Sequence, residues 1–128
     1  MDLSIREDEF SVQYLLKSDP AFWIRLVKPI GDTLCISDAL QGSLSEEELE
    51  AALTEVLTIH ASETVHSIIF ADIAPDLSSK ISDKRLVAER FDLLSTIAKR
   101  WAQKAGRQLE NSYLDIRYGK FGAIFKIS

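Results

Sequence analysis

Apolar and polar residues alternate over the first third of the chain, which is the pattern of strands that bury one face. Residues 10–16, 22–27 and 33–37 each follow this period of two. Ser18-Asp19-Pro20 separates the first two segments, and Gly31-Asp32 separates the second from the third. Because these connections are short, the pattern predicts three antiparallel strands in meander order.

The next segment carries the signals of a helix start. Ser45 and Glu48 have the spacing of a capping box, in which each side chain binds the other residue's backbone N–H. Leu44 and Leu49 have the spacing of the accompanying hydrophobic staple. A helix is therefore expected over about 46–60. Its expected buried stripe is Leu49, Ala52, Leu53, Val56, Leu57 and His60.

A longer amphipathic helix is expected over about 82–106. Its apolar residues recur at alternating spacings of four and three, and Gly106 is placed to end the helix in the left-handed conformation. The broad apolar face predicts that the rest of the domain packs against it, with Trp101 in the buried contact. The face comprises Leu86, Val87, Phe91, Leu93, Leu94, Ile97, Ala98, Trp101 and Ala105.

Three further strands complete the expected fold. Residues 68–71 form a continuous apolar run, typical of a central strand that is buried on both faces. Residues 113–118 and 121–127 are expected to pair around a turn at Gly119-Lys120. The sequence thus predicts one α+β domain over residues 1–128. Its expected order is βββ-α-β-α-ββ, with two helices packed on a mixed, mainly antiparallel sheet.

Composition supports a folded protein and shows an uneven distribution of charge. The 128 residues are 46% hydrophobic and 27% charged. These values are typical of a folded globular protein and exclude a disordered chain. The net charge of −5 divides into −9 over residues 1–64 and +4 over residues 65–128. This asymmetry predicts separate acidic and basic surfaces, provided that the two halves do not interleave in space.

The single cysteine, Cys35, excludes an intrachain disulfide and favours a reducing compartment. The first residues are acidic and lack the basic and apolar segments of a signal peptide. No apolar run approaches the roughly 18 residues that a membrane span needs. These features predict a cytoplasmic protein, or one exported by a route that leaves no such mark.

Candidate catalytic and metal-binding groups are few. His60 and His66 lie six residues apart without a nearby third ligand, and they are interpreted as capping or core histidines. Cys35 lies among apolar residues and is interpreted as a buried structural thiol. Asp72 and Asp76 lack the dense oxygen-rich loop of a hard-cation site. No glycine-rich phosphate loop or Gly-x-Ser-x-Gly motif is present, so neither a metal nor a cofactor is expected.

Two charged surfaces remain as candidate binding sites. Glu47, Glu50 and Glu55 point away from the buried stripe of the first helix, so they are the expected docking residues for a basic partner. Near the end of the second helix, basic residues complement the helix dipole and form a candidate anion-binding cluster. That cluster consists of Lys99, Arg100, Lys104 and Arg107.

The order of the expected elements resembles that of two known families. From Asp32 to Leu109, the run of strand, helix, strand and helix resembles a STAS domain, the small module of anti-sigma-factor antagonists. Ser78 and Ser79 follow the central strand, where that family carries its phosphorylatable serine, although the Asp-Ser-Ser-Gly pattern is absent. This resemblance implies a regulatory switch.

The whole order is also similar to the core of an N-acetyltransferase of the GNAT type. In that family a Gln/Arg-x-x-Gly-x-Gly/Ala loop holds the pyrophosphate of coenzyme A. The Leu-Gln-Gly-Ser segment at residues 40–43 has a different spacing. This resemblance implies a degenerate enzyme that binds acyl-coenzyme A or a nucleotide.

Charge and the absence of a reactive motif favour a different class of function. The leading hypothesis is a small acidic cytoplasmic binding protein of the immunity, inhibitor or adaptor type, which docks a basic protein partner through its acidic surface. The acetyltransferase-like enzyme and the STAS-like switch are the alternatives.

Overall fold

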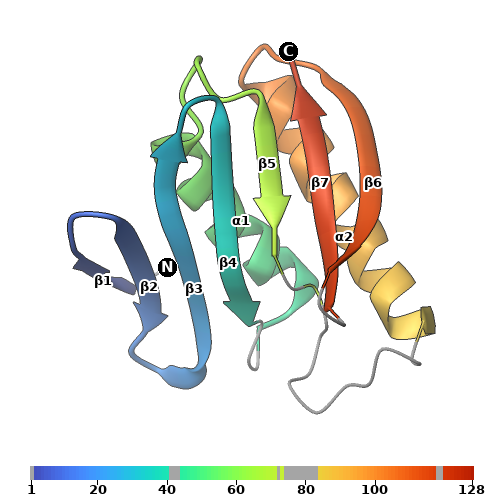
Figure 1. Ribbon diagram of the computed structural model, residues 1–128. Helices are drawn as coiled ribbons and strands as arrows, with labels where there is room; N and C mark the ends of the chain where they lie inside the picture. Colours follow the sequence, from blue (N-terminus) through green and yellow to red (C-terminus); the bar gives the residue numbers. More distant parts are fainter. Residues whose placement is uncertain (1, 41–43, 72, 74–83, 118–119) are drawn as a thin grey trace.

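A single sheet carries two helices on one of its faces (Figure 1). The computed structural model describes residues 2–40, 44–71, 73, 84–117 and 120–128. The elements of this described part are β1 (Leu3–Glu7), β2 (Ser11–Leu16), β3 (Asp19–Ile30), β4 (Thr33–Leu40), α1 (Glu46–His60), β5 (Ser67–Phe70), α2 (Lys84–Lys104), β6 (Leu109–Arg117) and β7 (Lys120–Ile127). None of the described helices is long and apolar enough to span a membrane.

The seven described strands are arranged in the order β1-β2-β3-β4-β5-β7-β6. β4 and β5 run parallel, and all the other neighbouring strands in this sheet run antiparallel. The α+β class and the mixed, mainly antiparallel sheet with two helices are confirmed. The expected order βββ-α-β-α-ββ is present from β2 onward, and β1 adds one strand before it.

Several strands extend beyond their expected bounds. β3 continues through Pro29 to Ile30, and the turn falls on Gly31, whose φ of +61° is in the left-handed region. β6 begins at Leu109, four residues before the expected start. β1 was not expected because it is short and pairs only with β2 among the described strands.

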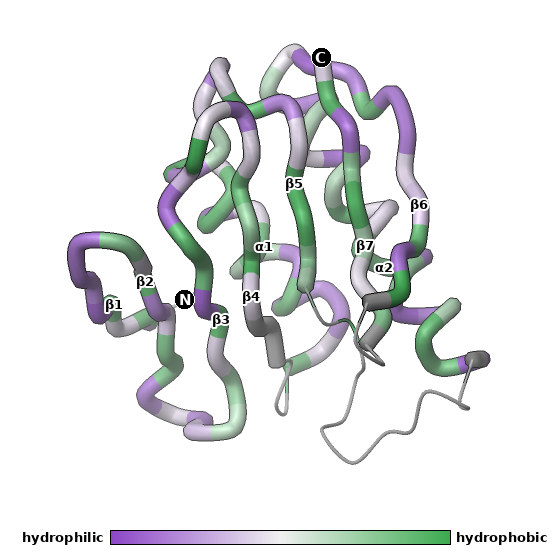
Figure 2. The backbone as a smooth tube through the Cα atoms, viewed as in Figure 1, coloured by the Kyte–Doolittle hydropathy of each residue, from purple (hydrophilic) through white to green (hydrophobic). Residues whose placement is uncertain are grey.

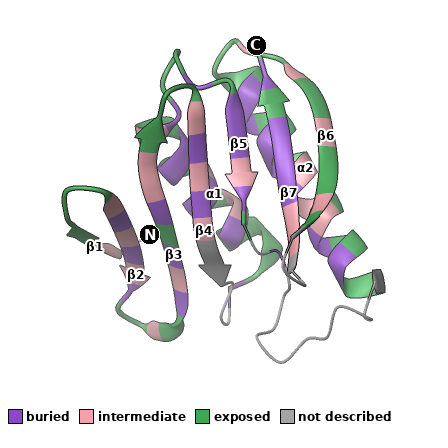
Figure 3. Ribbon diagram, viewed as in Figure 1, coloured by how far each residue is buried: buried purple, intermediate pink, exposed green. Residues whose placement is uncertain are grey.

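The core lies between the sheet and the helix layer. Alternate residues of the central strands are buried against the helices, including Phe22, Ile24 and Leu26 of β3 (Figure 3). Hydrophobic residues also run along the middle of β5 and β7 (Figure 2). β5 was expected to be buried on both faces, but Ile69 is only partly buried because the helices cover one face of the sheet.

The predicted start of α1 is confirmed in detail. The Glu48 N–H donates to Ser45 Oγ at 3.2 Å, and the Ser45 N–H donates to Glu48 Oε1 at 3.1 Å. Leu44 and Leu49 are both buried in the core, as the hydrophobic staple requires. This local chemistry fixes where α1 begins and therefore where its acidic first turn lies.

The end of α2 is a Schellman motif. Gly106 has a φ of +71°, its N–H donates to Gln103 O at 3.2 Å, and the Arg107 N–H donates to Ala102 O at 2.8 Å. The predicted helix end at Gly106 is therefore confirmed.

The predicted apolar face of α2 is buried along most of its length. Val87, Leu94, Ile97, Ala98 and Trp101 belong to the core. Two residues that were expected on this buried face are exposed instead. Leu86 is 37% exposed, and Ala105 is exposed just beyond the end of the helix.

Candidate partner-binding groove

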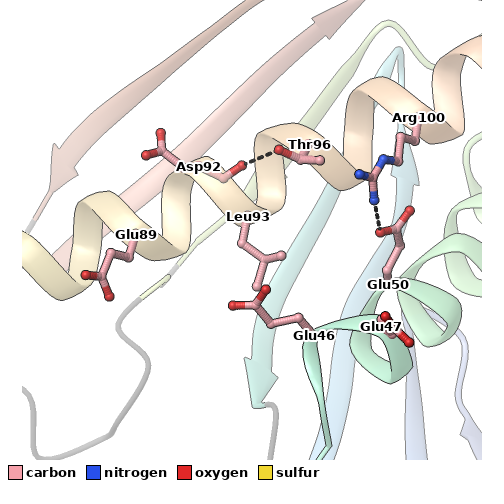
Figure 4. Close-up of a pocket in the computed structure, with 8 residues that line it drawn as sticks. All are labelled: Glu46, Glu47, Glu50, Glu89, Asp92, Leu93, Thr96 and Arg100. Carbon is pink, nitrogen blue, oxygen red and sulfur yellow. Dashed lines mark hydrogen bonds and ion pairs between the residues drawn. The ribbon is translucent and has the colours of Figure 1, made fainter.

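The two helices pack beside each other, and a cavity of about 450 Å³ lies between them (Figure 4). Among the described residues, five carboxylates and one basic side chain line this cavity. We call it the acidic groove. Its lining consists of Glu46, Glu47 and Glu50 from α1 and Glu89, Asp92, Leu93, Thr96 and Arg100 from α2.

Helix periodicity explains why these residues meet. Glu46, Glu47 and Glu48 form the first turn of α1, where carboxylates interact favourably with the helix dipole. On α2, residues 89, 92, 96 and 100 recur at spacings of three and four, so they lie along one side of the helix. That side faces α1, which brings the acidic residues of both helices to one seam.

An ion pair crosses the groove. Arg100 Nη1 lies 2.7 Å from Glu50 Oε1, and the two side chains are 59% and 21% exposed. An exposed pair of this kind stabilises a protein by only about 0–1 kcal/mol. The pair shows that a guanidinium group fits between the two helices (Figure 4).

A buried cation lies near Glu46, at the start of α1. Arg90 of α2 is 6% exposed, and burial lowers the pKa of its guanidinium group, whereas the nearby Glu46 carboxylate opposes this shift. An arginine retains its charge under such conditions. The sequence pattern did not predict Arg90 as a buried residue, because a charged residue on a helix is normally exposed.

The groove continues along the helix seam. A second cavity of about 500 Å³ shares Glu47 and Glu50 with the first and adds Ala51, Thr54, Glu55 and Lys104. A third, of about 240 Å³, is lined by Thr54, Thr58, Ala61, Trp101, Lys104 and Ala105. The seam is therefore acidic near the start of α1 and less charged towards its end.

The structure brings the three predicted docking residues to this seam. Glu47 and Glu50 each line both of the larger cavities, and Glu55 lines the second. Glu47 and Glu55 are exposed, whereas Glu50 is partly buried by its contact with Arg100.

The four residues of the predicted anion-binding cluster have different surroundings. Lys99 is exposed, Arg100 binds Glu50, and Lys104 lines the second and third cavities. Anion binding by these four residues stays a prediction.

Arg107 connects separate segments of the backbone. Its guanidinium group donates to the carbonyl oxygens of Ser62, Val65 and Ser128, and its Cζ lies 5.9 Å from the centre of the Trp101 ring. The geometry thus gives Arg107 a structural role in holding the loop after α1 against the chain end.

Sequence reasoning missed three acidic residues of the groove, namely Glu46, Glu89 and Asp92. Glu89 and Asp92 are three residues apart on the polar side of α2, which was a usable signal. The spacing of Glu89 and Asp92 indicates a shared site only when α1 is known to pack beside α2. The same packing interleaves acidic and basic halves of the chain, so charge is not separated by sequence half.

Both candidate histidines have structural partners. The Tyr14 hydroxyl lies 2.6 Å from His60 Nε2, and His66 Nδ1 lies 3.2 Å from Ile127 O. Cys35 was expected to be buried, but it is only half-buried, and this burial raises the pKa of its thiol. Asp72, Asp76, Ser78 and Ser79 lie outside the described residues. Within the described ranges, no group of three or more His, Cys, Asp or Glu side chains is arranged to hold a metal ion.

Comparisons of the chain with protein-family models, with curated proteins and with solved structures each gave no match.

Proposed function

We propose that this protein is a small acidic binding module, of the immunity, inhibitor or adaptor type, that docks a basic protein partner in the acidic groove. The observation that supports the proposal is that five acidic residues from two helices line one cavity. We place the module in the cytoplasm, where a single half-buried thiol is compatible with the reducing conditions.

Arginine is the side chain that suits this groove best. Its planar guanidinium group binds carboxylates through two parallel hydrogen bonds and is less strongly hydrated than an ammonium group. Arg100 already provides an intramolecular example at 2.7 Å from Glu50. The apolar side chain of Leu93 lies among the carboxylates and offers a contact for the methylene groups of an incoming arginine.

Charge complementarity of this kind acts most strongly on the rate of association. Electrostatic attraction raises association rate constants from about 10⁵–10⁶ to as much as about 10⁸–10⁹ M⁻¹s⁻¹ at low salt. The Debye length falls from about 30 Å at 0.01 M salt to about 8 Å at 0.15 M. Binding to the groove should therefore weaken steeply as salt is added.

An NMR titration tests the proposed site. The probe is a synthetic helical peptide with four arginines on one face, added to ¹⁵N-labelled protein at low and at physiological salt. We expect the largest shift changes in residues 46–55 and 89–100. Changes spread evenly over the acidic surface, or centred on the sheet, would contradict the proposed site.

A thermal-shift series tests the alternative enzymatic hypothesis in the same preparation. Acetyl-coenzyme A or a nucleotide at 100 times its dissociation constant would add about 2.7 kcal/mol of stability. A shift of that size with either compound would favour the alternative over the binding module.

A further inference from the structure

The third cavity of the helix seam differs in chemistry from the acidic groove. Among the described residues, none that lines it is acidic, and its walls are mainly small or aromatic side chains. Thr58 Oγ1 donates to the Thr54 carbonyl oxygen at 2.7 Å, so this hydroxyl group already has a partner within α1. The lining consists of Thr54, Thr58, Ala61, Trp101, Lys104 and Ala105.

The third cavity is large enough for one bulky apolar side chain. Its volume is about 240 Å³, whereas an apolar cavity of about 150 Å³ already accepts a benzene ring. Trp101 is 4% exposed, so most of its ring is fixed in the core and only a small part faces the cavity. Covering methyl groups and an indole ring with an apolar side chain removes them from water, which is favourable.

The third cavity and the acidic groove are joined along one seam. The second cavity shares Glu47 and Glu50 with the acidic groove. It also shares Thr54 and Lys104 with the third cavity. A single ligand that lies along the seam therefore contacts both the carboxylates and Trp101.

Charge changes from one end of this seam to the other. Arg85 and Arg100 each bind one carboxylate of the acidic groove. Glu47 and Asp92 make no ion pair with any described residue, so their carboxylates remain for the arginines of a partner. Lys104 lines the third cavity, where it repels a second cation and favours an uncharged side chain.

Helix geometry sets the spacing between the two contacts. Thr58 and Ala61 lie eight and eleven positions after Glu50 on α1, which is about 12–17 Å along the helix. A helix that lies beside α1 covers the same distance with the same number of residues. Positions eight or eleven apart also lie on one face of such a helix.

We propose that the third cavity binds a bulky apolar side chain of the same partner helix whose arginines bind in the acidic groove. This inference rests on the proposed function and adds a second contact to it. The partner is an amphipathic helix with arginines on one face and a residue such as leucine eight or eleven positions away on that face. The arginines speed association, and the apolar anchor slows dissociation.

Peptides with and without the apolar residue test the second contact. Each carries four arginines on one helical face, and the leucine peptide has leucine on that face eleven positions after the first arginine. The reference peptide has alanine there, and a third peptide carries leucine before the arginines at the mirrored position, because the helix can lie in either direction. In fluorescence anisotropy at 0.05 M salt, we expect one leucine peptide to bind about tenfold more tightly than the alanine peptide, which corresponds to about 1.4 kcal/mol.

Two leucine substitutions in the protein locate this contact. Ala105 is exposed and lines the third cavity, so Ala105→Leu fills the cavity without a change of charge. This variant should lose the preference for the leucine peptide and bind the alanine peptide within about twofold of wild type. Gln103→Leu is the matched control, because Gln103 is exposed on α2 and is not among the residues that line the cavity. Circular dichroism establishes that each variant is folded.

The outcomes separate this inference from the proposed function. If the alanine peptide and both leucine peptides bind wild type equally well, the third cavity holds no apolar anchor, although the acidic groove still binds arginine. A preference that survives in Ala105→Leu would place the apolar contact elsewhere and would also overturn the inference. If none of the peptides binds, the proposed function and the inference both fail.

Discussion

Trp101 anchors the contact between the helix layer and the rest of the core. It is 4% exposed, belongs to the core cluster and also lines the third cavity of the helix seam. Truncating a large buried aromatic residue removes apolar contact and leaves a cavity, which costs about 3–5 kcal/mol.

We predict that Trp101→Ala lowers the free energy of unfolding by about 3–5 kcal/mol in urea denaturation. Phe10→Ala is the control, because Phe10 is 70% exposed and should change stability by no more than about 0.5 kcal/mol. If Trp101→Ala does not fold, Trp101→Phe provides a milder test. A loss below about 1 kcal/mol for the alanine variant would contradict the assigned face of α2.

Arg107 is predicted to act through the backbone carbonyls that it binds. Arg107→Ala removes the donors to Ser62, Val65 and Ser128 and should lower the free energy of unfolding by at least about 1.5 kcal/mol. Lys99→Ala removes the same charge from an exposed site, so its effect should stay within about 0.5 kcal/mol. Equal small losses in both variants would refute the structural role of Arg107.

His60 makes stability depend on pH below neutrality. Burial lowers the pKa of His60 from its ordinary value of 6.5, an effect that Glu7 partly opposes and Lys28 reinforces. The unfolded chain therefore binds more protons in the window between the lowered pKa and 6.5. The stabilising contribution is complete above pH 6.5 and declines as the pH falls through the lowered pKa.

Urea denaturation of wild type and His60→Gln between pH 7.5 and 5 measures this contribution. We predict that wild type loses more stability than the variant as the pH falls through this range. If the variant had the same pH dependence as wild type, the pKa of His60 would be the same in the folded and unfolded chain, which would contradict the prediction.

At the scale of elements, α1 depends on its capping box. Ser45→Ala removes the hydroxyl that accepts the Glu48 N–H, so it should cost about 0.5–2 kcal/mol of stability. Ser45→Asp retains an acceptor at the cap and should stay close to wild type in the same denaturation experiment. An alanine variant as stable as wild type would mean that the cap contributes little to folding.

The elements differ in how far the sequence predicted them. α1 was predicted closely because its start depends on local chemistry, namely the spacing of Ser45 and Glu48. The extents of β3 and β6 depend instead on pairing with neighbouring strands, which a local pattern does not contain. β1 gave no clear signal for the same reason, because its five residues are held by pairing with β2.

At the scale of the whole molecule, the groove depends on which helices become neighbours. The sequence indicated Glu47, Glu50 and Glu55 from one helix, but Glu89 and Asp92 join them only through the packing of α2 beside α1. The Arg100–Glu50 pair likewise joins residues that lie 50 positions apart. Long-range contacts of this kind cannot be derived from periodicity, which reports only the buried face of each helix.

We propose that charge inside the groove, rather than acidity in general, binds a basic partner. Two double variants separate these effects, because each changes the net charge from −5 to −1. Glu47→Lys with Asp92→Lys reverses charge inside the groove, whereas Glu63→Lys with Glu110→Lys reverses it at exposed sites outside the groove's lining.

Fluorescence anisotropy with the labelled four-arginine peptide measures the dissociation constants of both variants at 0.05 M salt. We predict that the groove variant binds at least tenfold more weakly than wild type, which corresponds to about 1.4 kcal/mol, and that the outer variant stays within threefold. Equal weakening in the two variants would contradict the account, because binding would then follow net charge alone.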